Sequence, residues 1–160
     1  MLKVLSHPVG DEQPITLVEH YARAAWVTSG VNHEVNVAIR RSTDEAADAG
    51  PAEVLRETTK AREQVAAALR DQSADRVVVI PWQGWALTLH DFLVTRMMEI
   101  AVHSDDLAAS VGIEAPPLPA DVLDPVLGLL TGLAVRRHGQ AAVLRALTRR
   151  ERAPESIAAF

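Results

Sequence analysis

The sequence of 160 residues contains no cysteine. Disulfides and thiolate metal ligands are therefore excluded, and any metal site must be built from His, Asp and Glu. Lysine is scarce as well: of the 16 basic residues only Lys3 and Lys60 are lysines, and the arginines are spread among acids, with a net charge of −5. Because the sequence lacks a basic stripe of the kind that follows phosphates, we expect no nucleic-acid partner.

Long apolar runs are also missing. No run approaches the roughly 18 to 20 residues that a membrane span needs, and the opening MLKVLSHPVGDEQP lacks the apolar region of a signal peptide. We therefore expect a cytoplasmic protein with no membrane partner. With 48% hydrophobic residues, the chain is long enough to bury a core, and its length favours one domain over residues 1–160.

The first half of the chain carries helix signals after an irregular lead-in at residues 1–14. Thr16 can cap a helix with Glu19 three residues later, as a capping box requires. This helix is expected to run to about residue 49, with Gly30 as a weak point or break. Gly50 and Pro51 then open an amphipathic surface helix over residues 51–72.

The second half is also predicted to be helical. The run of valines near 76–80 is β-like but too short to found a sheet. A helix is expected from Leu89 to Ser110, capped at its C-terminal end by Gly112, and it is apolar in nearly every direction, which predicts burial on most sides. Two further helices, over 122–138 and 140–150, precede a tail at 151–160. We predict an all-α protein, an up-and-down bundle of four or five helices.

Four ionisable residues interrupt the apolar helix that begins at Leu89. Their spacings of three, four and three place them within about 80° of one another on a helical wheel. We call them the polar row: Arg96, Glu99, His103 and Asp106. Read structurally, the row is a set of ion pairs on a helix, Arg96 with Glu99 and His103 with Asp106.

A functional interpretation starts from Glu99 and His103. They lie one helical turn apart, so a carboxylate and an imidazole can reach one divalent ion, and Asp106 can orient the imidazole from behind. Two ligands are a weak signal on their own, because a complete site needs at least one more from another helix. The donor types suit zinc, nickel or manganese better than copper(I).

The stretch TRMMEIAVHSDDLAASVG, residues 95–112, resembles the signature of the mycothiol-dependent maleylpyruvate isomerase family, a branch of the DinB-like helical bundles. The shared pattern is an Arg, a Glu and a His spaced R-x-x-E-x-x-x-H, then an acidic pair and Leu. The lead-in PWQGWALTLHDFLVTR is similar too. The resemblance covers nearly the whole chain, but only this helix is specific.

The resemblance implies a divalent metal, usually zinc, held by Glu99, His103 and a further His on the first long helix of the bundle. It implies that the metal activates mycothiol as a thiolate, and that the small-molecule substrate is isomerised by thiol addition, bond rotation and elimination. Arg96 is then the catalytic cation that holds a carboxylate or orients Glu99. Asp106 is then the carboxylate that orients the imidazole of His103. The implied function is that of an isomerase or thiol-transfer enzyme.

Compared with the family, the chain is expected to lack the first helix and its remaining His, through truncation, a misassigned start codon or genuine loss, because the sequence begins at the turn that follows that segment. None of the other five histidines is a convincing replacement. His7 precedes Pro8, His20 could face either way, and His90 is too far along the helix from His103. His33 is expected in solvent, and His138 at a helix end.

Without that first helix, the bundle is expected to have an open apolar face, which invites a partner or a homodimer. The alternative function is therefore a non-catalytic bundle with an incomplete metal site that binds a ligand or a partner.

Overall fold

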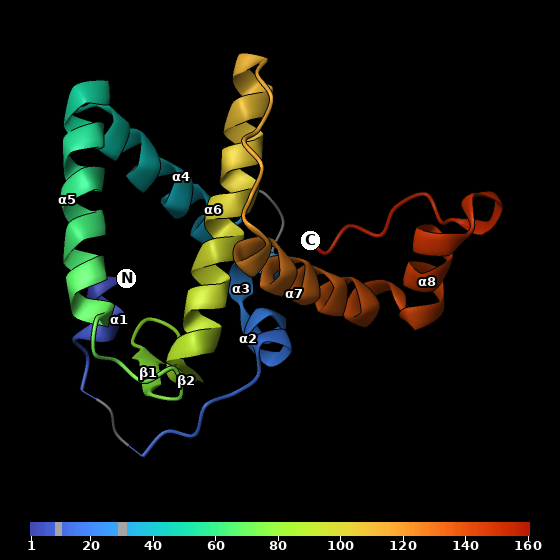
Figure 1. Ribbon diagram of the computed structural model, residues 1–160, viewed down its shortest axis with the longest axis horizontal. Coiled ribbons are helices and arrows are strands. Elements are labelled where there is room, and N and C mark those ends of the chain that lie inside the picture. Colours follow the sequence, from blue (N-terminus) through green and yellow to red (C-terminus); the bar gives the residue numbers. More distant parts are fainter. Residues whose placement is uncertain (9–10, 29–31) are drawn as a thin grey trace. The chain divides into compact units, whose positions relative to one another are not determined.

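A computed structural model describes residues 1–8, 11–28 and 32–160 of the chain. It contains two compact units, Met1–Ile15 with Ala22–Leu89, and Thr16–Tyr21 with His90–Phe160. We describe each unit by itself. The described residues are mostly helical with one two-stranded sheet, which confirms the predicted all-α class with a short β segment (Figure 1).

The first unit is built around a β-hairpin and a short N-terminal helix. Its elements are α1 (Leu2–Leu5), α3 (Ala25–Thr28), α4 (Glu34–Ala47), α5 (Pro51–Leu69), β1 (Val77–Ile80) and β2 (Trp85–Thr88). The strands pair antiparallel, with Val77 opposite Thr88 and Ile80 opposite Trp85. Helix α1 contacts both α5 and β1, and the Arg76 guanidinium donates a hydrogen bond to the Leu5 carbonyl at 2.8 Å. The hairpin is therefore tied to the start of the chain.

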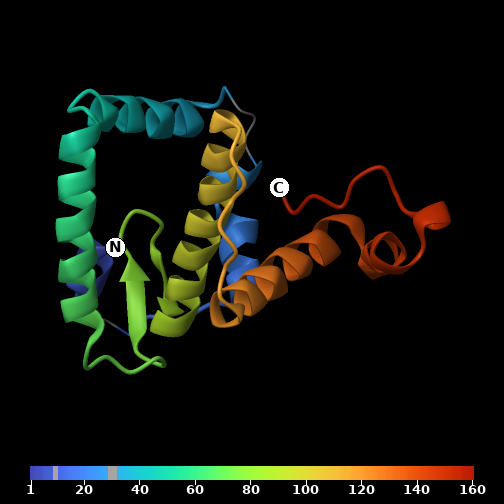
Figure 2. The same cartoon turned by 45° about the horizontal axis from the view of Figure 1, so that its top comes forward.

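Helices α4 and α5 extend from this hairpin and bury little. They meet at a corner formed by Gly50 and Pro51 (Figure 2). Pro51 occupies the first turn of α5, where its missing N–H has no helical partner to lose. Helix α5 has no buried residue, so it is the surface helix that its charge pattern predicts.

The second unit contains the polar row. Its elements are the start of α2 (Leu17–Arg23), α6 (Leu89–Val111), α7 (Ala120–His138), α8 (Gln140–Thr148) and the 3-10 helix η1 (Arg150–Arg152). Helix α2 packs on α7, because a Cβ added at Gly132 would lie 3.6 Å from Cγ2 of Val18. The core of the unit combines buried side chains from all four α-helices: His20, Tyr21, Phe92, Val94, Thr95, Met98, Val126, Leu129, Leu133 and Val143.

Several predicted helix boundaries agree with the structure. The Glu19 backbone N–H donates to Oγ1 of Thr16 at 3.2 Å, so Thr16 caps α2. Gly112 and Gly139 follow α6 and α7 with φ of 73° and 81°, a conformation that favours glycine after a helix. The last helix ends at Thr148, two residues before its predicted end, and η1 follows.

Other predictions were wrong. The lead-in is not wholly irregular, because α1 forms at Leu2–Leu5 and buries Val4 and Leu5. The long helix expected to start after Thr16 is divided into α2, α3 and α4, with Ala24 between the first two. The break expected at Gly30 lies outside the described residues. The valine run does form a sheet, because the segment after the Gly84 turn supplies β2 as its partner.

Helix α6 is buried only in its first half. Phe92, Val94 and Met98 are enclosed, whereas Ile100 and Leu107 are each 65% exposed. Beyond Val102 the only buried residue of the helix is Ala108. The extended segment after Gly112 runs back along one side of this half (Figures 1 and 2), and the Ile113 N–H bonds to the Ala108 carbonyl at 3.0 Å. Burial on most sides therefore holds for the first half alone.

None of the helices in the described residues is both long enough and apolar enough to cross a membrane.

Candidate functional site

The polar row forms a continuous chain of contacts along α6. An Nη2 atom of Arg96 lies 3.9 Å from Oε1 of Glu99, and Oε2 of Glu99 lies 3.3 Å from Nε2 of His103. The side chains of the row become more exposed toward the C-terminal end of the helix, from 30% at Glu99 to 70% at His103. The spacing in the sequence therefore predicts the geometry correctly, because contacts at i,i+3 and i,i+4 are local to a helix.

His103 is held between two carboxylates. Its Nε2 faces Glu99, and its Nδ1 lies 3.2 Å from Oδ2 of Asp106. The carboxylate behind the ring fixes the orientation of the imidazole, as partners of metal-bound histidines do. Asp106 thus contacts the ring nitrogen opposite the one that faces Glu99, and its role in orienting a metal ligand stays a prediction.

Neighbouring residues of α6 hold the side chain of Arg96 in place. Its Nε donates to Oγ1 of Thr95 at 3.1 Å, and the Thr95 hydroxyl donates in turn to the Phe92 carbonyl at 2.7 Å. The guanidinium carbon lies 5.6 Å from the centre of the Phe92 ring, within range of a cation–π interaction. These contacts fix the inner edge of the guanidinium, and sequence reasoning did not identify Thr95 or Phe92 as its supports.

Two residues of α2 lie in the electrostatic field of the row. His20 is 4% exposed and Tyr21 is 1% exposed, and their rings meet edge to face at 4.9 Å between centres. Burial, and then the nearby charge of Arg96, lower the pKa of His20 to about 4. Burial, and then Glu99, raise the pKa of Tyr21 above its ordinary value, while Arg96 acts in the opposite direction.

His20 therefore belongs to the same unit as the row and is uncharged at neutral pH. From the sequence alone this residue could face either way, and nothing local to α2 marks it as a neighbour of Arg96. The remaining histidines are elsewhere. His7 lies in the bend after α1, and Nε2 of His138 contacts the Ala158 carbonyl at 2.8 Å.

The donors of the row fit a shared metal ion in type and separation. Two ligand atoms about 2.0–2.1 Å from a tetrahedral zinc ion lie about 3.4 Å from each other, close to the 3.3 Å between Glu99 and His103. The row supplies two such donors, Glu99 and His103, because Asp106 contacts the other ring nitrogen of His103. Within residues 1–8, 11–28 and 32–160, no three or more His, Asp or Glu side chains form a group that could hold a metal.

Comparison with known proteins connects this helix to a family. The model of the mycothiol maleylpyruvate isomerase N-terminal domain matches residues 3–108, which includes the whole polar row. No curated protein and no solved structure matches the chain. The match spans well over half of the 160 residues, and the chain belongs to the mycothiol maleylpyruvate isomerase N-terminal domain family.

Proposed function

We propose that the chain acts in mycothiol-linked isomerisation or thiol transfer, with a divalent metal held at Glu99 and His103. The observation that carries the proposal is the arrangement on α6: a carboxylate oxygen 3.3 Å from one imidazole nitrogen, and a second carboxylate 3.2 Å from the other. Family membership supplies the chemical context, since the family takes its name from mycothiol and maleylpyruvate.

Glu99 and His103 would be two ligands of the metal. A catalytic zinc site commonly has three protein ligands and one open position, so a third donor is part of the proposal, and zinc is the metal that we expect first. When bound, the metal would stabilise the thiolate form of a thiol cosubstrate such as mycothiol. Asp106 would accept a hydrogen bond from Nδ1–H of His103 and so keep Nε2 unprotonated and free to bind the ion.

Arg96 would bind a carboxylate of the substrate. Its side chain is 37% exposed, and the contacts with Thr95 and Phe92 hold the inner edge of the guanidinium. Arginine presents paired N–H donors that match a carboxylate. Arg96 would therefore orient a substrate that has a carboxylate beside its reacting double bond, so that the double bond lies near the proposed metal position next to Glu99.

Metal titration tests the proposal. Protein purified without a metal-affinity tag is titrated with Zn²⁺ and with Mn²⁺, and we expect about one equivalent to bind at micromolar concentration. Glu99→Gln and His103→Ala should each weaken binding by at least about tenfold. His90→Ala is the matched control, because His90 lies on the same helix and contacts a carboxylate, Asp91, at 3.1 Å. Uptake of less than about a tenth of an equivalent by the unaltered chain would refute the metal site.

A second candidate function is favoured because the described residues provide two metal ligands on the row and no group of three. It is a non-catalytic member that binds a ligand or partner through the same row. An isomerase assay separates the two candidates: turnover of maleylpyruvate that requires both mycothiol and metal supports the enzyme, whereas binding of maleylpyruvate without turnover supports the second candidate.

A further inference from the structure

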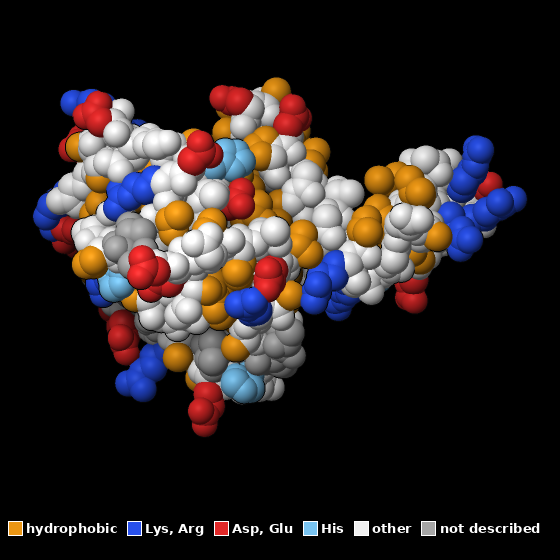
Figure 3. Space-filling model, turned by 90° about the horizontal axis from the view of Figure 1, so that it is seen from below, with side chains coloured by type: hydrophobic (Ala, Val, Ile, Leu, Met, Phe, Trp, Pro, Cys, Tyr) orange, Lys and Arg blue, Asp and Glu red, His pale blue; other side chains and the backbone are white. Residues whose placement is uncertain are grey.

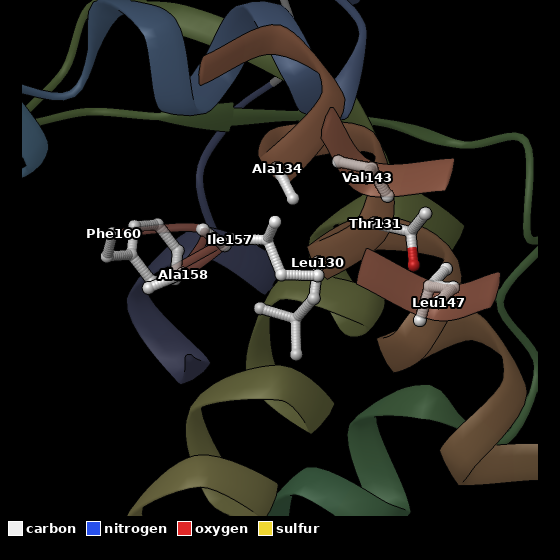
Figure 4. A pocket seen from close by; sticks show the side chains of 9 residues that line it. Leu130, Thr131, Ala134, Val143, Leu147, Ile157, Ala158 and Phe160 are labelled. Carbon is white, nitrogen blue, oxygen red and sulfur yellow. The ribbon is translucent and has the colours of Figure 1, made fainter. Parts of the chain in front are cut away.

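The C-terminal part of the second unit contains a pocket that the polar row does not use. The pocket has a volume of about 310 Å³. It opens between α7, α8 and the segment that follows η1 (Figure 4). All of its lining residues lie beyond residue 108, where the family match ends. The residues are Leu130, Thr131, Ala134, Val143, Leu147 and Ile157 to Phe160.

The lining predicts an apolar occupant. Thr131 is the only lining residue with a polar side chain, so nearly every contact available to a ligand is with hydrocarbon. The volume is near the lower end of the roughly 300–1,000 Å³ of ligand pockets. At about 30 Å³ for a group of the size of water, it holds roughly ten non-hydrogen atoms, the size of a medium-length alkyl chain.

The terminal segment forms one wall and is held in place at two points. Nε2 of His138 lies 2.8 Å from the Ala158 carbonyl oxygen, and the rings of Phe160 and Tyr21 are 5.6 Å apart between centres. The wall is therefore attached both to the end of α7 and to α2. Because these contacts lie within one unit, the pocket does not depend on how the two units are arranged.

Basic residues outnumber acids in the chain around the pocket. Residues 136–155 contain six arginines and two acids, Glu151 and Glu155. Arg137 lies one helical turn after the lining residue Ala134, on the same face of α7. In Figure 3 the projecting part at the right, formed by α8 and the segment after it, carries apolar side chains beside a cluster of arginines. An apolar pocket with this rim fits a ligand with an alkyl chain and an anionic head.

We propose that this pocket binds a medium-chain amphiphilic carboxylate, with the alkyl chain between α7 and α8 and the carboxylate at Arg137. Apolar burial provides the affinity for the chain, and the guanidinium of Arg137 selects an anionic head over a neutral one. The site is independent of the proposed metal chemistry at Glu99 and His103, because it uses none of the residues of the polar row.

The test is calorimetric titration with monomeric decanoate, with 1-decanol as the uncharged ligand of the same length. We expect decanoate to bind with one site per chain. Leu147→Asp should weaken binding of both ligands several-fold, because it replaces an apolar contact of the wall with a charged group. Leu144→Asp is the matched control: both leucines lie on α8, at 67% and 59% exposure, and Leu144 does not line the pocket. Both positions are exposed enough for the variants to fold, which circular dichroism checks.

Charge selection is tested by the variant Arg137→Gln. It should weaken decanoate binding several-fold and leave decanol binding unchanged. His103→Ala should bind decanoate as the unaltered chain does, so loss of the metal site and loss of the pocket are separately visible.

Three outcomes would overturn the proposal. The first is no decanoate binding by the folded chain. The second is equal loss of affinity in the Leu147 and Leu144 variants. The third is sedimentation with anionic phosphatidylglycerol vesicles without binding of monomeric decanoate, since that result assigns the surface to a bilayer.

Discussion

The Nε atom of Arg96 donates a hydrogen bond to the hydroxyl of Thr95, its neighbour in the chain, at 3.1 Å. Thr95 is 1% exposed, and its hydroxyl donates a hydrogen bond to the Phe92 carbonyl. A guanidinium held in this way presents its outer nitrogens toward Glu99 with less freedom than an arginine in solvent. The buried hydroxyl therefore positions the cation that we propose as the carboxylate-binding group.

Replacing Thr95 by Val removes the hydroxyl and keeps the shape. We expect a loss of about 0.5–1.5 kcal/mol in the free energy of unfolding, the typical net value of one hydrogen bond, measured by urea denaturation. Binding of maleate, a small dicarboxylate, should weaken several-fold as Arg96 loses its anchor. Thr95→Ser keeps the hydroxyl and should keep maleate binding. Equal maleate affinity in the Val and Ser variants would show that the hydroxyl does not position Arg96.

Asp106 is expected to tune the metal site without binding the metal. Asp106→Asn replaces the carboxylate that faces Nδ1 of His103 by a weaker partner, and changes of this kind typically cost 10–100-fold in metal affinity. Asp105→Asn changes the charge equally at the preceding position, which lies outside the polar row. Zn²⁺ titration should therefore separate the two variants. If both lose the same affinity, the effect is one of net charge.

The polar row could be predicted from the sequence because every contact in it is local. Spacings of three and four fix Glu99, His103 and Asp106 on one face of any helix, and the structure only adds the distances. The ends of the helices at Gly112 and Gly139 are predictable for the same reason, since a glycine with positive φ is a local signal.

The surroundings of the row could not be predicted in this way. His20 and Tyr21 are far from Arg96 in the sequence, and only the packing of the start of α2 within the second unit brings them into its field. The sequence does not predict strand β2, because its segment has no clear β pattern of its own. The segment becomes a strand by pairing with β1. Whether a short apolar run forms a strand depends on the strand that pairs with it, and local sequence patterns do not identify that partner.

His20 should make stability depend on pH. Its pKa is about 4 in the folded chain and near 6.5 when unfolded. The unfolded state therefore binds the proton more readily, so the contribution is fully present above pH 6.5 and is lost as pH falls from 6.5 toward 4. A shift of this size corresponds to roughly 3 kcal/mol. Urea denaturation between pH 7.5 and pH 4.5 measures it.

Two variants separate His20 from other groups that titrate in acid. His20→Gln cannot take up the proton and should flatten the dependence of unfolding free energy on pH between 6.5 and 4.5. His90→Gln changes a histidine whose side chain is 64% exposed and should leave the curve as it is. An unchanged curve in the His20 variant would mean that this imidazole is not buried in the neutral form.

Tyr21 provides a spectroscopic test of its place beside the row, because it is the only tyrosine in the chain. The absorbance of its phenolate near 295 nm therefore reports one residue. In urea the phenol should ionise near pH 10, its ordinary pKa. In the folded chain the titration should move to higher pH, because burial and Glu99 both raise this pKa. Circular dichroism at each pH confirms that the chain stays folded.

The two charged neighbours of Tyr21 should shift its titration in opposite directions. Glu99→Gln removes a negative charge that opposes phenolate formation, so the pKa of Tyr21 should fall while remaining above 10, since burial is the larger cause. Arg96→Gln removes a positive charge that favours the phenolate, so the pKa should rise. Asp105→Asn serves as the control for charge on the same helix. Shifts of the same sign in the Glu99 and Arg96 variants would exclude a direct electrostatic origin, because a general loosening of the packing moves both titrations toward pH 10.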